Sequence, residues 1–143
     1  MGTRSNIGMV QENGTVKCVY CHWDGYPDNN GLLLVRHWKT KEKIEDMLDL
    51  GDMSSLGSEL GHIHDFDKSN APENEHFCTF YGRDRGESDV EAQIMTKEDF
   101  SKGFAGAEYV YLFEDGKWLY KNLYESNNWE NLTDVINIKD IIE

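Results

Sequence analysis

Residues 4–23, RSNIGMVQENGTVKCVYCHW, decide the fold prediction because they describe one complete β-hairpin. Asn13-Gly14 stands near its centre, and Asn-Gly is the strongest short hairpin signal because both residues accept positive φ. The segments on either side, 4–10 and 15–23, have strand character, and the second is rich in β-branched and aromatic residues. We therefore expect two antiparallel strands at the start of the chain.

The rest of the chain predicts more strands and a few short helices. The further strands are expected at 77–82, 89–95, 108–113 and 117–123. The helices are expected at 31–38, 41–50 and 97–103, with a last one from Thr133 onward. A polar region rich in Gly, Ser and Asn, 51–75, is expected to be the longest loop. The predicted fold class is α+β, a mainly antiparallel sheet of about six strands with three or four helices packed on one face.

Length and charge restrict the classes of partner. The 143 residues fit one domain, 1–143, and no interdomain linker is evident. The net charge of −13 disfavours DNA, RNA and anionic membranes as partners. An excess of acidic residues usually means only a well-solvated surface. The more specific alternative is a protein that mimics nucleic acid. The first ten residues lack the apolar core of a signal peptide and no apolar run is long enough for a membrane span, so we expect a cytosolic protein.

The cysteines give only a weak metal signal. There are three of them, an odd number at low density, which implies no disulfide framework. Cys18-x-x-Cys21 lies in a predicted strand, where the two side chains would point to opposite faces, so shared zinc ligation is disfavoured. The other residues of the candidate metal set are His22, His62, His64, Asp65, Asp67, His76 and Cys78. His22 cannot easily activate its neighbour Cys21, because adjacent side chains on a strand diverge. We expect no metal, no cofactor and no catalytic nucleophile, and the alternative is that the His64-x-x-Asp67 loop binds a cation by itself.

Two short segments concentrate residues that a fold alone does not need. The first, Tyr20–Tyr26, contains no ordinary aliphatic side chain and lies where a strand passes into a loop. The second, Tyr81–Glu87, holds two of the four arginines of the chain in a loop flanked by glycines. Arginine forks and backbone amides beside glycine suit phosphate or carboxylate. The alternative for the second segment is that both arginines pair with neighbouring acids on the surface.

Several stretches together resemble a family of small proteins found in phages and prophage regions, mostly labelled hypothetical. The stretches are Gly2–Ser5, Tyr20–Tyr26, Leu50–Gly57, His64–Asp65 and Tyr81–Glu87. The resemblance runs from the N-terminus through the predicted hairpin near 109–118 and implies a phage accessory protein acting in the host cell cytosol. Such proteins often counter host defence, and one strategy is to sequester nucleotide-derived immune signals.

These observations predict a binding protein for a phosphorylated, nucleotide-like small molecule. The expected ligand-binding residues are Arg4, His22, Trp23, Asp24, Tyr26, Arg83, Asp84, Arg85 and Glu87. The arginines would hold phosphates, the aromatic rings would stack on a base, and His22 with Asp24 would read hydroxyl groups or base edges. A homo-oligomer could close a pocket around the ligand.

Two other functions remain open from the sequence. A small hydrolase of a nucleotide-derived substrate would use His22, Asp24, His64 and Glu87 as acid and base, and we lean against an enzyme because no motif of a known mechanism is present. An acidic protein-binding inhibitor would need none of these side chains.

Overall fold

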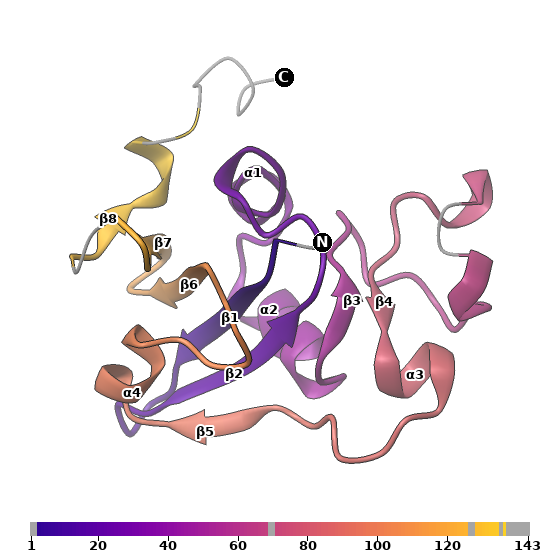
Figure 1. Ribbon diagram of the computed structural model, residues 1–143, viewed down its shortest axis with the longest axis horizontal. Coiled ribbons are helices and arrows are strands. Elements are labelled where there is room, and N and C mark those ends of the chain that lie inside the picture. Colours follow the sequence, from indigo (N-terminus) through magenta and orange to yellow (C-terminus); the bar gives the residue numbers. More distant parts are fainter. Residues whose placement is uncertain (1–2, 69–70, 126–127, 135, 137–143) are drawn as a thin grey trace.

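The sheet of this protein has two hairpins laid side by side. The computed structural model describes residues 3–68, 71–125, 128–134 and 136. The strands are β1 (Ser5–Val10), β2 (Val16–Cys21), β3 (Met53–Ser55), β4 (Thr79–Phe80), β5 (Gln93–Met95), β6 (Tyr109–Glu114), β7 (Lys117–Asn122) and β8 (Glu130–Asn131). Their order is β4-β3-β2-β1-β6-β7-β8, and β5 pairs with the start of β2 (Figure 1). The α+β class is confirmed, with eight strands among the described residues rather than about six.

Both predicted hairpins are present because their turn residues adopt the required backbone conformation. β1 and β2 pair antiparallel from Ser5↔Cys21 to Val10↔Val16, with Gly14 at φ 86° in the turn. β6 and β7 pair around Asp115 and Gly116, whose φ values are 53° and 79°. Two consecutive positive φ values are what a tight two-residue hairpin turn needs.

The sheet is mixed rather than antiparallel throughout. β1 pairs parallel with β6 over five residue pairs, which joins the two hairpins, and β2 pairs parallel with β3 at Cys21↔Met53. Both parallel contacts join segments far apart in the sequence. The local patterns that predict hairpins therefore carry no information about them.

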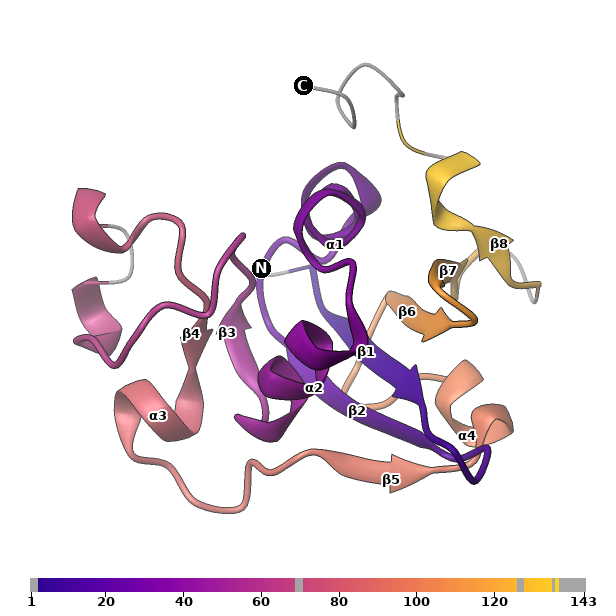
Figure 2. The same cartoon turned by 180° about the vertical axis from the view of Figure 1, so that it is seen from behind.

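The helices cover both faces of the sheet, which corrects the expectation of one face. They are α1 (Leu32–His37), α2 (Lys41–Asp49), α3 (Tyr81–Arg85) and α4 (Lys97–Ser101), and a π-helical turn, Pro27–Gly31, leads into α1. α1 and α2 lie over one face of the sheet (Figure 2), and their buried residues pack with Ile7, Val19 and Cys21. Phe100 of α4 packs with Cys18 on the opposite face. Cys18 and Cys21 therefore point to opposite faces of β2, as strand alternation predicts.

Three regions differ from the predicted elements. The expected loop 51–75 contains β3 and two 3-10 turns, Phe66–Lys68 and Pro72–Asn74. The expected strand 77–82 is only β4, because the chain turns into α3 at Tyr81. The predicted last helix begins as a 3-10 turn, Leu132–Asp134, and the rest of it lies almost wholly outside the described residues. No helix within the described ranges is long and apolar enough to cross a membrane.

Candidate functional site

The loop after β2 is held rigidly by buried hydrogen bonds. The N–H of Gly25 donates to the carbonyl of Thr3 at 2.8 Å, and the carbonyl of Gly25 accepts from the hydroxyl of buried Tyr111 at 2.5 Å. Asn30, also completely buried, donates its side-chain amide to Ser5 Oγ and to the carbonyl of Trp23. A loop fixed at this many points presents its outward side chains in one arrangement, as a preorganised binding site requires.

Gly25 is the one position of this loop where a side chain cannot fit. A Cβ there would lie 2.7 Å from Cβ of Ser5 and 2.8 Å from the carbonyl oxygen of Thr3. The glycine thus allows the loop to lie directly against the start of β1. Its role is structural, and it brings Arg4 and Trp23 onto the same part of the surface.

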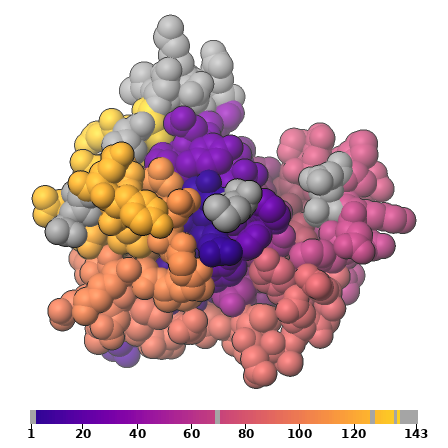
Figure 3. Space-filling model, viewed as in Figure 1, coloured from indigo at the N-terminus to yellow at the C-terminus, as the bar shows by residue number. Residues whose placement is uncertain are grey.

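Four side chains form what we call the Arg4–Trp23 surface: Arg4, Tyr20, His22 and Trp23. Tyr20 of β2 and His22, directly after β2, share the face opposite to α1 and α2, because side chains two residues apart in extended chain point the same way. The indigo N-terminal residues lie at the centre of the face shown in Figure 3. Trp23 is 44% exposed, and the edge-to-face contact between its ring and that of His22 has a centroid distance of 4.7 Å.

Hydrogen bonds link the polar members of this surface. The hydroxyl oxygen of Tyr20 lies 2.6 Å from Nδ1 of His22, and Arg4 also donates to Tyr20. Because Arg4 can only donate, we assign the Tyr20 proton to the bond with Nδ1, which leaves the proton of neutral His22 on Nε2. Burial and the Arg4 charge lower the pKa of His22 below its usual value, which favours this neutral form. Burial raises the pKa of Tyr20, and Arg4 acts in the opposite direction.

Arg4 stands out because it lacks an acidic partner. No ion pair joins its guanidinium to a carboxylate within the described part of the chain, although the whole chain has 27 acids. Its Nη1 lies against Gly106, where an added Cβ would be 3.0 Å away. An exposed guanidinium without an acidic partner, linked through Tyr20 and His22 to an exposed indole, is an arrangement that can bind an anionic aromatic ligand.

The second predicted segment places its first arginine inside the protein. Arg83 donates Nε and Nη2 to the completely buried carboxylate of Asp84, Nη1 to the carbonyl of Leu60 and Nη2 to that of Cys78, at 2.9 to 3.2 Å. The Asp84 carboxylate also accepts the backbone N–H of His64 and Phe80. Protein groups therefore use the Arg83 fork and the Asp84 oxygens, and a phosphate could reach that fork only by displacing these bonds.

Arg85 and Glu87 lie on the surface beside that buried pair. Nε of Arg85 is 3.6 Å from a Glu87 carboxylate oxygen, and its guanidinium lies 5.0 Å from the centroid of the Phe66 ring. Both arginines of the segment thus pair with neighbouring acids. The segment Tyr81–Glu87 still adjoins the segment Tyr20–Tyr26, because Asp52 bonds to both. Its carboxylate accepts the N–H of Tyr20, and its backbone carbonyl accepts the N–H of Tyr81.

Asp24 and Tyr26 lie at the other side of the loop. Asp24 lines a cleft of about 420 Å³, which we call the Asp24 cleft. Its other lining residues are Asn29, Leu33, His37, Ser55, Leu56, Gly57, Ser58, Glu75, His76 and Phe77. Tyr26 is 40% exposed, and no ring contact joins it to Trp23 within the described ranges. Apart from Asp24 and the metal candidate His76, the residues of this cleft were not predicted as site residues, although Ser55–Gly57 belong to a stretch that carries the phage-family resemblance.

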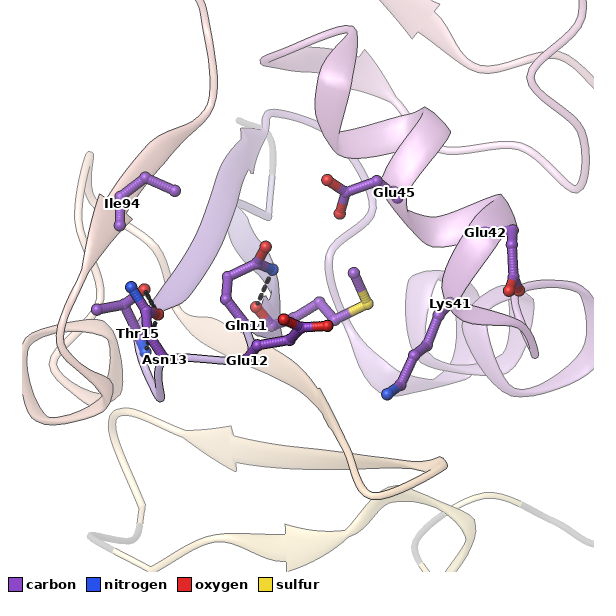
Figure 4. Close-up of a pocket in the computed structure, with 9 residues that line it drawn as sticks. Gln11, Glu12, Asn13, Thr15, Lys41, Glu42, Glu45 and Ile94 are labelled. Atoms are coloured by element: carbon purple, nitrogen blue, oxygen red, sulfur yellow. Dashed lines mark hydrogen bonds between the residues drawn. The ribbon is translucent and has the colours of Figure 1, made fainter.

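A larger, open groove lies at the far end of β1 and has different chemistry. It measures about 720 Å³ and lies between the β1–β2 turn, α2 and Ile94 of β5 (Figure 4). Glu12, Glu42 and Glu45 line it with a single cation, Lys41. None of the predicted site residues lies there, and its carboxylates would repel a phosphorylated ligand.

The metal and acid–base sets from the sequence are dispersed. Among the described residues no three His, Cys, Asp or Glu side chains converge as metal ligands would. His64, whose side chain is 5% exposed, lies between Thr79 and Asp84, away from His22. All three cysteines are buried, and burial raises the pKa of each thiol to about 12, so none is a ready nucleophile.

Comparison with protein-family models, with curated proteins and with solved structures finds no match to this chain. The Arg4–Trp23 surface and the Asp24 cleft, which the loop after β2 joins, are therefore the features from which a function can be inferred.

Proposed function

We propose that the protein binds a phosphorylated, nucleotide-like small molecule at the Arg4–Trp23 surface. The observation that carries this proposal is the exposed Arg4 guanidinium, which has no acidic partner in the described part of the chain and is linked through Tyr20 and His22 to the exposed ring of Trp23. Arg4 would hold a phosphate, with His22 Nε2–H as a second donor. Stacking of a base on Trp23 would contribute about 1–3 kcal/mol.

The acidic surface is compatible with such a ligand. The net charge of −13 is spread over the molecule, and at physiological ionic strength charges act over only about 8 Å. A local cation therefore determines whether a phosphate binds close to it. Only one or two cationic side chains would contact the phosphate. The affinity should therefore fall only modestly as the salt concentration rises, unlike that of a protein with an extended basic surface.

Binding without turnover is the form of this function that we favour. The acid and base that hydrolysis would need are not gathered, since His64 is buried in the Asp84 network and Glu87 pairs with Arg85. With the phage context that the resemblance implies, the proposed role is sequestration of a nucleotide-derived immune signal in the host cell cytosol. A tight, rigid site serves that role because a sponge must hold its ligand.

Tryptophan fluorescence provides the test. Trp23 is 44% exposed and the most exposed tryptophan, whereas Trp129 is partly buried and Trp38 and Trp118 are 0% and 4% exposed, so a stacked base should quench chiefly the Trp23 signal. We expect Trp23→Phe to remove most of the quenching, and Arg4→Ala to weaken binding at least about tenfold, the loss of one charge-assisted contact. Arg85→Ala is the matched control and should have little effect. An unchanged affinity in Arg4→Ala would refute this site.

A further inference from the structure

The Asp24 cleft has the size and lining of a small-ligand site. Its volume of about 420 Å³ lies within the range of roughly 300–1,000 Å³ that is usual for such sites. α1, the segment 55–58 and the segment 75–77 form its walls. Leu33, Leu56 and Phe77 supply apolar surface, and the remaining side chains offer hydroxyl, amide, imidazole and carboxylate groups. Such a mixture suits a ligand with both an apolar face and hydroxyl groups.

The fold does not require the carboxylate of Asp24. Its backbone has φ 55°, a conformation that glycine or asparagine also supplies, and only its carbonyl is used, by N–H of Asn30 and the amide of Asn29. No ion pair involves Asp24 in the ranges that the structure describes. An exposed carboxylate that lines a cleft and has no protein partner among the described residues is a hydrogen-bond acceptor available to a ligand.

The hydroxyl groups across the cleft are similarly uncommitted. Neither Ser55 Oγ nor Ser58 Oγ has a hydrogen-bond partner within the described residues, and both line the cleft. His37 adds an imidazole whose pKa is lowered by burial and by Arg36, Lys43 and Lys39, so that it is neutral near pH 7. The cleft thus presents one strong acceptor together with groups that both donate and accept.

The charges around the cleft are of both signs, so neither an anion nor a cation has a clear advantage there. Asp24 and Glu75 on its walls would repel a phosphate or a carboxylate. The positive charges of Arg36, Lys39 and Lys43 act on His37 and would oppose a bound cation. A neutral, hydroxyl-bearing group is the ligand chemistry that remains.

We infer that the Asp24 cleft binds the vicinal diol of a ribose, with the Asp24 carboxylate as its acceptor. This inference rests on the proposed function, which supplies the sites for the base and the phosphate of the same ligand. Asp24 directly follows Trp23 in the chain, so the loop after β2 carries both the indole on which a base would stack and the carboxylate that would accept from a ribose. A carboxylate that accepts from a ribose 2′-hydroxyl is a known way to distinguish ribose in nucleotide sites.

Two nucleotides that differ by one hydroxyl test the inference. We would titrate AMP and 2′-deoxy-AMP into the protein and follow backbone amide signals by NMR, with Asp24→Asn and Asp89→Asn as variants. Asp89 is the matched control because it is exposed, has φ 61° and loses the same charge. We expect AMP to bind about ten- to a hundredfold more tightly than 2′-deoxy-AMP, as the loss of a hydrogen bond to a charged group predicts. Asp24→Asn should abolish that preference, and Asp89→Asn should preserve it.

Equal affinities for the two nucleotides, or an equal loss of both in Asp24→Asn, would overturn the inference while leaving nucleotide binding at Arg4 intact. A third probe, methyl β-D-ribofuranoside, separates the two proposals because it has neither base nor phosphate. If AMP fails to bind, shifts of the Gly57 and Ser58 amides with the ribofuranoside, lost in Asp24→Asn, would support the cleft alone. The absence of those shifts would overturn the inference.

Discussion

Replacing Asp84 with alanine should destabilise the protein strongly, because this carboxylate is the centre of a buried network. Its two oxygens accept the backbone N–H groups of His64 and Phe80 at 3.1 and 2.8 Å. They also accept Nε and Nη2 of Arg83 at 3.0 and 3.2 Å. Truncation removes all four bonds and leaves two amides and part of a guanidinium without an acceptor.

The expected loss follows from the burial of the pair. Removing one partner of a buried ion pair costs about 3–5 kcal/mol. Arg83 keeps the carbonyls of Leu60 and Cys78, so part of its charge stays solvated by the protein and we expect a loss of about 3–4 kcal/mol. For a chain of this length each kcal/mol corresponds to about 3 °C, which predicts a Tm lower by about 10 °C.

Urea and thermal unfolding followed by circular dichroism would measure this loss. Glu87→Ala is the control, because its exposed pair with Arg85 is worth about 0–1 kcal/mol. Asp84→Asn keeps one acceptor oxygen and should lie between the wild type and Asp84→Ala, so the test survives if the alanine variant does not fold. If Asp84→Ala and Glu87→Ala lost the same small amount, the structural role of the Arg83–Asp84 pair would be refuted.

Three further predictions concern the rigid loop, the histidines and the thiols. Gly25→Ala should lower stability by about 1–3 kcal/mol, since the new Cβ would clash with Cβ of Ser5 and the carbonyl oxygen of Thr3, and should also weaken ligand binding; unaltered urea unfolding would contradict the close approach. Because His22 and His37 have lowered pKa values, the unfolded chain binds more protons below about pH 6.5, so stability should fall as pH drops through that value. His22→Gln should lose less stability than the wild type between about pH 7.5 and about pH 5.5 in urea titrations, and an identical loss would place the effect elsewhere. All three cysteines should resist a thiol reagent at about pH 8 in the native protein and react in denaturant, whereas fast native labelling would show that a thiol is accessible.

Local chemistry accounts for the elements that could be predicted from the sequence. Asn13-Gly14 and Asp115-Gly116 define hairpin turns without help from the rest of the chain. Thr40 caps α2 by accepting the N–H of Lys43, as its position before the helix predicts. The switch from β4 to α3 was not predictable, because it depends on the Asp84 carboxylate bonding back to Phe80.

The candidate site was likewise predictable from the sequence only in part. Strand alternation correctly indicated that Cys18 and Cys21 would point to opposite faces of the second strand. The environment of Arg83 could not be foreseen, since its acceptor Leu60 lies 23 residues earlier in the chain. The Asp24 cleft likewise combines α1 with two distant loops, and only the folded chain brings them together.

Depletion of nucleotides by the purified protein tests the central claim most directly. The protein would be incubated with cyclic and linear nucleotides and ADP-ribose derivatives and removed by filtration, and the filtrate would be quantified by chromatography. The retained protein would then be denatured to release what it holds. We predict that the wild type depletes at least one compound, that the compound returns chemically intact, and that Arg4→Ala depletes much less of it. A compound that returns altered would indicate an enzyme, and a panel in which nothing is depleted would contradict small-molecule binding.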